Sequence, residues 1–199
     1  NIWRAPTDND MYIKQEWKKA HYDAAYTRAY RIEVLQNKHG VLIMEHVAVV
    51  ADTVQKILDV KMTWKINEDG KIEAVIEAIK DKEFPDLPRF GIRMFLNKKM
   101  DEITYFGMGP QESYRDKHQA SCHGLFRSKV AQMHEDYIRP QENGSHYDCD
   151  YVELTNGQCG IAAVSKNPFS FNASVYTQEE LERVSHNYEL KESDSIVFC

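Results

Sequence analysis

Apolar and polar residues alternate over long stretches of the chain. The runs Tyr30–Leu35 and Val41–Val50 both alternate, and His39-Gly40 between them is typical of a turn. A period of two places successive side chains on opposite faces of a strand. The sequence therefore predicts an antiparallel hairpin over this region.

A second hairpin has the clearest pattern in the sequence. Its two strands are separated by the turn residues Asn67–Gly70. The apolar positions on one face are Val60, Met62, Trp64, Ile66, Ile72, Ala74, Ile76 and Ala78. Both strands keep the period of two, which predicts that they pair as an antiparallel hairpin.

Further short strands are expected along the rest of the chain, separated by Gly, Pro, Asn or Asp. Many short strands at close spacing are typical of a sandwich, so the predicted fold class is all-β with antiparallel sheets. These strands are Arg89–Leu96, Asp101–Tyr105, Asp148–Thr155, Cys159–Ser165 and Phe169–Ser174.

Helical signals are few. Thr177 begins a capping box in which Glu180 is expected to reach back to the cap, and this predicts a helix of about two turns. A second short helix is expected over Ile13–Ala20, with Trp17 facing inward.

Composition narrows the class of ligand. The 199 residues carry 25 Lys and Arg against 31 Asp and Glu, for a net charge of −6. No apolar run has the roughly 18 residues that a membrane helix needs, and no basic cluster favours nucleic acid. A neutral ligand such as a sugar fits better. The four cysteines form no CxxC pair, so we expect reduced thiols and a cytoplasmic location.

Three polar segments combine tight turns with carboxylates, amides and Arg, which can bind vicinal hydroxyls. They are Trp3–Asp10, Gly107–Asp116 and Arg139–Gly144. Turn networks and internal ion pairs use the same residue types, so a structural role stays open for each segment. The candidate carbohydrate-binding or domain-interface residues are Arg4, Asp8, Asn9, Asp10, Glu112, Arg115 and Glu142.

Within these segments, specific pairings are expected. Glu112, Arg115 and Asp116 are expected to pair with one another, and Glu142 to accept hydrogen bonds from backbone amides of its turn. Gly107 and Gly109 are expected to allow close backbone approach. The eight histidines show no zinc spacing, and the sequence carries no phosphate loop or nucleophile elbow, so we assign no metal ligand and no catalytic residue.

The same segments carry a resemblance to a known family. The opening Asn1–Asp10 resembles the start of the C-terminal, small-chain region (domain 5) of bacterial β-galactosidases of the lac type, in glycoside hydrolase family two. The resemblance continues in order through most of the chain. The further matching segments are Pro88–Ile92, Tyr105–Asp116, Tyr137–Gly144, Phe169–Asn172 and Tyr176-Thr177.

This resemblance implies an antiparallel β-supersandwich related to galactose mutarotases. It implies that residues 1–199 are a single domain, truncated at its C-terminal end, of a larger retaining enzyme that hydrolyses terminal β-D-galactosides such as lactose. The catalytic glutamates are expected on a preceding barrel domain, and an aromatic residue that stacks on the sugar is expected beyond residue 199. No cofactor is expected in this chain, while the parent enzyme would use Mg and Na ions held mainly by other domains. Its partners would be those other domains, the galactoside and further copies in a homo-oligomer.

Two other functions stay open. A mutarotase-like aldose epimerase would need a carboxylate base and a His acid, for which Glu142 and His118 are candidates. A stand-alone carbohydrate-binding module would use Trp3, Tyr105 or Tyr114 as a stacking platform. The leading hypothesis is a galactosidase segment that shapes the sugar pocket and braces the barrel, and that has no activity alone.

Overall fold

The computed structural model describes residues 1–199, apart from the side chain of Asn37. The chain divides into two compact units. The N-terminal unit comprises Ile2 and residues 11–88, and the C-terminal unit comprises Asn1, residues 3–10 and residues 89–199. The expectation of one sandwich domain over residues 1–199 stays a prediction.

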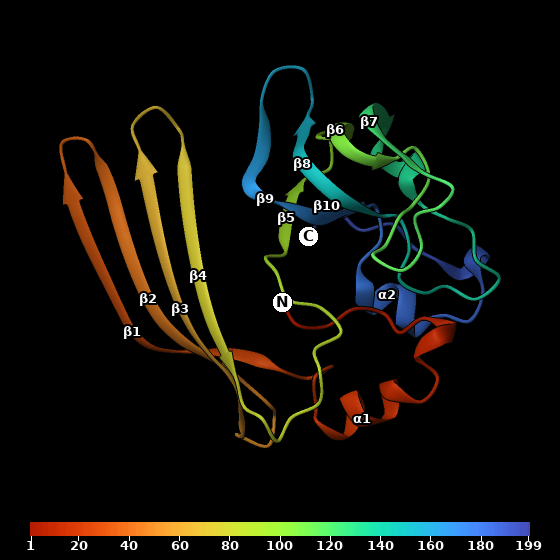
Figure 1. Ribbon diagram of the computed structural model, residues 1–199, viewed down its shortest axis with the longest axis horizontal. Helices are drawn as coiled ribbons and strands as arrows, with labels where there is room; N and C mark the ends of the chain where they lie inside the picture. Colours follow the sequence, from red (N-terminus) through yellow and green to blue (C-terminus); the bar gives the residue numbers. More distant parts are fainter. The chain divides into compact units, whose positions relative to one another are not determined.

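The N-terminal unit is built on a four-stranded antiparallel sheet with strands in the order β1-β2-β3-β4 (Figure 1). Both predicted hairpins are confirmed, because β1 pairs with β2 and β3 pairs with β4 in antiparallel register. The strands are β1 (Tyr26–Asn37), β2 (Gly40–Val50), β3 (Lys56–Asn67) and β4 (Ile72–Lys80). Each strand is longer than its alternating core, since backbone pairing continues beyond the last apolar position.

Helix α1 (Ile13–Lys19) lies in the same unit and confirms the predicted short helix. Trp17 is buried, and its indole nitrogen donates to the Asp86 carbonyl at 2.9 Å. Nearby, the Tyr22 hydroxyl donates to the Pro85 carbonyl at 2.7 Å. These two bonds tie the segment around α1 to the chain that leaves β4.

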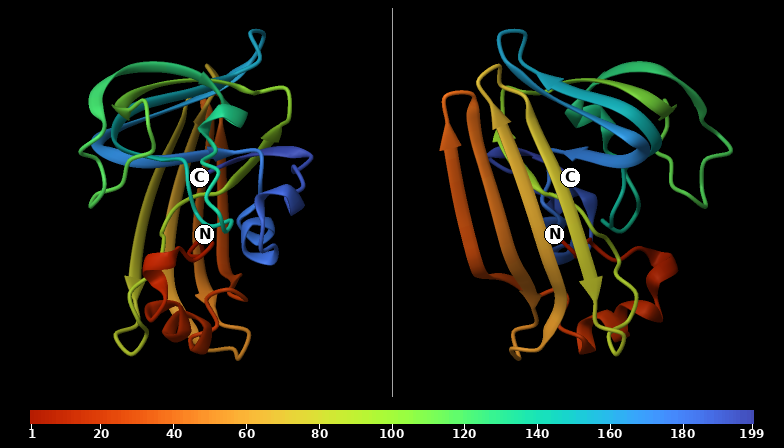
Figure 2. Two further views of the ribbon diagram at one scale, coloured as in Figure 1. Left: turned by 90° about the vertical axis from the view of Figure 1, so that its right-hand side faces the viewer. Right: turned by 60° about the vertical axis from the view of Figure 1, so that its left-hand side comes forward.

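The C-terminal unit contains a six-stranded antiparallel sheet in the order β5-β10-β9-β8-β6-β7. Its strands are coloured from green to blue in Figure 2. Its core combines side chains from several strands, including Tyr105, Val152 and Phe171, all with exposed fractions of 2% or less. The strands are β5 (Met94–Asn97), β6 (Glu102–Gly109), β7 (Cys122–Lys129), β8 (Ser145–Thr155), β9 (Gly160–Ser174) and β10 (Ser195–Phe198). Short 3-10 turns are η1 (Asp8–Asp10), η2 (Val130–Met133) and η3 (Asn187–Glu189).

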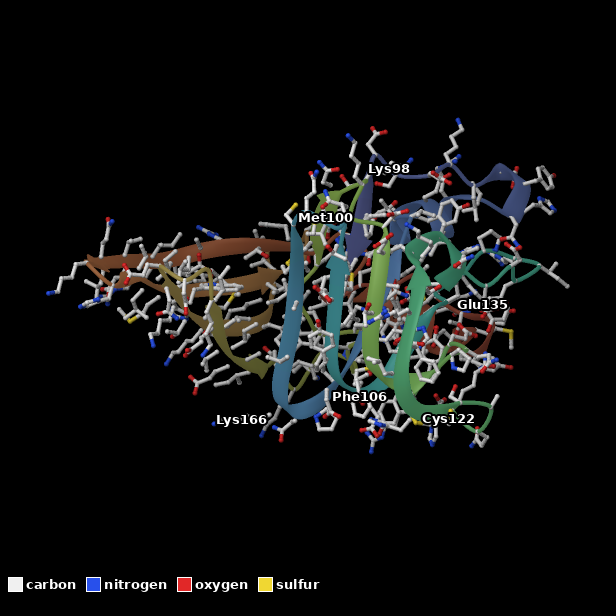
Figure 3. The ribbon with its side chains drawn as sticks, turned by 90° about the horizontal axis from the view of Figure 1, so that it is seen from above. Lys98, Met100, Phe106, Cys122, Glu135 and Lys166 are labelled. Atoms are coloured by element: carbon white, nitrogen blue, oxygen red, sulfur yellow. The ribbon has the colours of Figure 1, made fainter. Side chains whose placement is uncertain are left out.

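Strand β9 differs from the sequence prediction, which placed two strands, Cys159–Ser165 and Phe169–Ser174, in this region. The structure joins them into one. Residues 165–168 of β9 stand against Asp150 alone on β8, so Pro168 falls in an irregular part of the ladder. A bulge is where a strand tolerates proline, because no ladder hydrogen bond is lost there. Figure 3 shows the ribbon bending beside Lys166.

Three other strand assignments also changed. The predicted strand Arg89–Leu96 is replaced by the shorter β5, which pairs with the four residues of β10. Strand β7 was not predicted, since its inward face uses the small residues Gly124 and Ser128 beside Phe126 and gives a weak apolar period. Strand β10 at the end of the chain was not predicted either.

Helix α2 (Gln178–Arg183) confirms the predicted cap, because the Thr177 hydroxyl accepts from the Glu180 amide at 3.1 Å. The second half of the capping box is wrong. The Glu180 carboxylate accepts instead from Arg183 at 2.8 Å and from the Lys191 amide at 2.9 Å. A guanidinium one turn away offers a stronger, charge-assisted partner than the cap amide.

The predicted all-β class with one or two short helices is confirmed, while the relation to galactose mutarotases stays a prediction. The close approach expected at Gly107 is also confirmed. A Cβ on that residue would lie 2.2 Å from Cys149 Sγ and 2.9 Å from its Cα. Across the described residues, we find no helix with the length and apolar character to cross a membrane.

Candidate functional site

The first polar segment is organised around Asp10 at the end of η1. Its carboxylate pairs with the Arg4 guanidinium through contacts of 2.7 and 2.9 Å and accepts from the Thr7 amide at 2.8 Å and the Thr7 hydroxyl at 3.0 Å. Asp10 is 8% exposed. Four donor contacts use the lone pairs of this carboxylate, as expected for the structural turn network.

The same segment is joined to the third one through Asp8. The Asp8 amide donates to the side chain of Gln141 at 2.9 Å, and Gln141 Nε2 donates back to the Asp8 carboxylate at 3.1 Å. Asn9 is exposed beside them. The first and third segments, distant in sequence, therefore form one polar surface of the C-terminal unit.

Glu142 forms a buried ion pair with Arg89, whose side chain is 18% exposed against 4% for the glutamate. The Glu142 amide donates to the Ala5 carbonyl at 3.3 Å. Burial opposes the charged form of Arg89, but the neighbouring carboxylate outweighs it and raises the pKa of the guanidinium. The expectation that Glu142 would bind backbone amides of its own turn is wrong, because Arg89 supplies a stronger donor.

Glu112 accepts from four groups that come from two loops. One carboxylate oxygen accepts from Lys117 Nζ and from the Tyr137 hydroxyl. The other accepts from the Gly144 amide at 2.9 Å and the Tyr114 hydroxyl at 3.2 Å. Lys117 also donates to Tyr137 at 2.7 Å. Glu112 thus joins the second polar segment to the loop that carries the third.

The hydrogen-bond donors around Glu112 favour the ionised form of its carboxyl group. Burial tends to raise the pKa of this carboxyl, but the bonds from Lys117, Tyr137 and Gly144 outweigh burial and lower it. The same contacts raise the pKa of Lys117. Glu112 is therefore a stable anion near neutral pH, which suits a structural anchor better than a proton donor.

Arg115 does not take part in this cluster. The expected pairing of Glu112, Arg115 and Asp116 is wrong, because Lys117 occupies the position beside Glu112 while Arg115 and Asp116 are exposed. The backbone explains why Lys117, and not Arg115, lies beside Glu112. Tyr114 and Lys117 form an isolated antiparallel bridge, which leaves the two residues between them at the tip of the turn.

An open pocket of about 480 Å³ lies between the loop that joins β6 to β7 and the loop that precedes β8. Burial and the nearby Glu112 charge raise the pKa of Glu135, which Figure 3 labels. His118 keeps one ring nitrogen 3.0 Å from the Tyr114 carbonyl. The lining residues are Gln111, Glu112, Lys117, His118, Gln119, Ala120, Glu135, Asp136 and Tyr137.

The residues proposed for the two alternative functions do not have the positions that those functions require. Glu142 is not among the residues that line the pocket beside His118, so the two do not face a common space there. Trp3 is 5% exposed and Tyr105 is 1% exposed, which leaves neither ring free to stack on a sugar. The Tyr114 hydroxyl donates to Glu112.

Sequence reasoning missed four residues that complete these clusters: Arg89, Lys117, Tyr137 and Gln141. Each lies inside or next to a segment that the sequence analysis quoted, but a contact between distant segments leaves no periodic signal. Among the described residues, no group of three or more His, Cys, Asp or Glu side chains is placed to hold a metal ion.

Comparison with known proteins gives a consistent result. A family model described as β-galactosidase small chain matches residues 1–199. The β-galactosidase of Actinobacillus pleuropneumoniae is 47% identical over 199 residues, covering 100% of this chain and 19% of the relative. That of Staphylococcus xylosus is 36% identical over 194 residues, covering 98% of this chain and 20% of the relative.

A third relative, the β-galactosidase of Priestia megaterium, is 28% identical over 207 residues, covering 98% of this chain and 19% of that protein. The chain thus spans about one fifth of the length of the curated relatives it matches. The order of the polar segments, the all-β fold and the match over the whole chain agree. The chain belongs to the β-galactosidase small-chain family.

Proposed function

We propose that this chain is a structural segment of a β-galactosidase, which shapes the sugar pocket and braces the catalytic barrel without carrying the reaction. One observation supports this above all. The three buried carboxylates of the polar segments, Asp10, Glu112 and Glu142, are all engaged by donors of the chain itself.

The surroundings of these three carboxylates favour a structural role over glycoside hydrolysis. A retaining enzyme needs two carboxyl groups about 5 Å apart on either side of the scissile bond, one of them with a raised pKa so that it donates a proton. The pKa of Glu112 is lowered instead, and Glu142 is held by Arg89. This chain would be part of a longer polypeptide, which we call the parent polypeptide. We therefore assign the catalytic glutamates to the rest of the parent polypeptide.

The bracing role follows from how the clusters are connected. Asp8 and Gln141 join the first and third polar segments, while Glu112 joins the second segment to the Gly144 backbone. Segments more than 100 residues apart in sequence are thus fixed in one rigid surface. The parent polypeptide would hold Mg and Na ions mainly in its other domains, and its partners would be the galactoside and further copies in a homo-oligomer.

The test is an assay for nitrophenyl β-galactoside hydrolysis on the parent polypeptide, on this chain alone, and on this chain mixed with the remaining part. We expect turnover by the parent and by the mixture, and none by this chain. Lactose titration of the chain by calorimetry runs beside it. Turnover or anomer exchange by the chain alone would contradict the proposal, and strong sugar binding would favour a carbohydrate-binding module.

A further inference from the structure

The outer face of the C-terminal sheet carries a row of apolar side chains that crosses four strands. Phe106 on β6 lies opposite Leu125 on β7 and Tyr151 on β8, and Tyr151 lies opposite Val164 on β9. Residues directly opposite in antiparallel strands share one face. We call these four residues the outer apolar row. Figure 3, which labels Phe106, shows the four strands side by side.

The row points away from the core. The sequence neighbours of its members, Tyr105, Phe126 and Val152, belong to the buried core or pack against it. Leu125 is 61% exposed, Val164 is 73% exposed and Phe106 is 40% exposed. Four aligned apolar side chains on one sheet face are unlike the scattered apolar residues of an ordinary surface, and such groups typically mark an interaction site.

Polar side chains border the row on one side. The next row along the strands contains Arg127, Thr104 and Glu153, which are also paired across β7, β6 and β8. The Glu153 carboxylate accepts from the Tyr151 hydroxyl at 2.9 Å. An apolar centre with a polar border is the usual anatomy of a protein interface.

Arg127 supplies the charge that the partner must match. It is exposed, and among the described residues no carboxylate forms a salt bridge with it. Glu102, on the same face, is paired with Lys129 at 3.1 Å. Arg127 therefore favours a partner that brings a carboxylate to the margin of the row.

We propose that the outer apolar row, together with Arg127, docks a segment of the parent polypeptide that has apolar side chains and a carboxylate at its margin. This inference rests on the proposed function, because it names the surface through which the chain braces the rest of the enzyme. Relatives about five times as long as this chain contain ample polypeptide to supply such a segment.

Hydroxyl-radical footprinting of the parent polypeptide tests the docking directly, since it measures the solvent access of side chains. Labelling of Leu125, Phe106 and Val164 is expected to rise several-fold on denaturation. Ile138, 94% exposed, and Tyr188, 83% exposed, serve as controls whose labelling changes little. If denaturation changed the labelling of the outer apolar row as little as it changes that of the controls, the proposal would be overturned.

Variants provide the second measurement. Leu125→Asp and Val164→Asp are expected to lower the galactosidase activity and melting temperature of the parent polypeptide, while Ile138→Asp leaves both unchanged. Arg127→Glu should weaken docking, whereas Arg127→Lys keeps the positive charge and should largely retain docking. Because Leu125 and Val164 are exposed in the sheet, loss of local folding is not the expected cause.

Three outcomes separate the possible failures. Protection of the row that disappears when the parent is diluted to monomers would assign the face to a second copy and overturn the proposed occupant. A parent polypeptide without galactosidase activity would reject the proposed function, yet footprinting would still report on the face. If Leu125→Asp and Val164→Asp left the activity and melting temperature of an active parent unchanged, as Ile138→Asp does, only the docking surface would be rejected.

Discussion

Arg89 and Glu142 form a buried ion pair that ties the segment before β5 to the loop before β8. Glu142 lies in the third polar segment and Arg89 in the family-matching segment Pro88–Ile92, and each neutralises the charge of the other. Because the two charges pair with each other, both contribute to the structure of the C-terminal unit.

We predict that Glu142→Gln lowers the free energy of unfolding by about 3–5 kcal/mol, because it leaves the buried Arg89 guanidinium without a counter-charge. The double variant Arg89→Met with Glu142→Leu should be much less harmful, since it removes both charges. Urea denaturation of the three proteins measures the difference. A single variant as stable as the wild type would show that the pair is solvated.

Glu112 should give the protein a specific sensitivity to acid. Its folded pKa is lowered, so its contribution to stability is present above the unfolded pKa of roughly 4.3 and is lost as pH falls through the folded value. We expect Glu112→Gln to cost about 2–3 kcal/mol at pH 7, as for loss of charged hydrogen bonds, and less at pH 3.

Melting temperatures between pH 3 and pH 8 check this prediction. Asp116→Asn is the matched control, because Asp116 is an exposed carboxylate on the same loop. The control should keep the wild-type pH profile. A Glu112→Gln profile that runs parallel to the wild type at every pH would contradict the assigned role of the Glu112 carboxylate.

The cysteines should differ sharply in reactivity. Burial raises the pKa of Cys149 to about 12, and its side chain is fully buried. Cys122 and Cys159 are exposed. Because the thiolate is the reactive form, iodoacetamide at pH 7.5 should label Cys122 and Cys159 in the native protein and Cys149 only after unfolding. Mass spectrometry of peptides from both states decides this.

Gly107→Ala should destabilise the C-terminal unit by about 1–3 kcal/mol, as overpacking of a tight core does. The added methyl would overlap the Cys149 side chain and approach its backbone, which cannot move aside without disturbing β8. Gly91→Ala is the control, since nothing lies within 4 Å of its Cβ position. Equal stability of the two variants would contradict the close contact between β6 and β8.

The sequence predicted the hairpins of the N-terminal unit well because both depend on local alternation and a turn. Strand β7 escaped because its inward residues Gly124 and Ser128 are small, and the large ones, such as Leu125, point outward. Pro168 suggested a break in β9, but the bulge that accommodates it depends on the partner strand β8. Pairing partners cannot be derived from the period of one strand.

The polar clusters were located from the sequence but their partners were not. Asp10 acts within its own turn, and local turn chemistry anticipated that role. Glu112 and Glu142 take partners that lie 25 and 53 positions away, Tyr137 and Arg89, and no spacing rule relates such residues. Contacts of this kind are fixed by the tertiary fold.

Under the proposed function, the carboxylates of this chain support the structure and do not carry the reaction. The most direct measurement is kcat for nitrophenyl β-galactoside in the parent polypeptide bearing Asp10→Asn, Glu112→Gln or Glu142→Gln, assayed well below the melting temperature. We predict lower melting temperatures with kcat within about tenfold of the wild type. A fall in kcat by a factor of about 10⁴ or more with an unchanged melting temperature would contradict the claim.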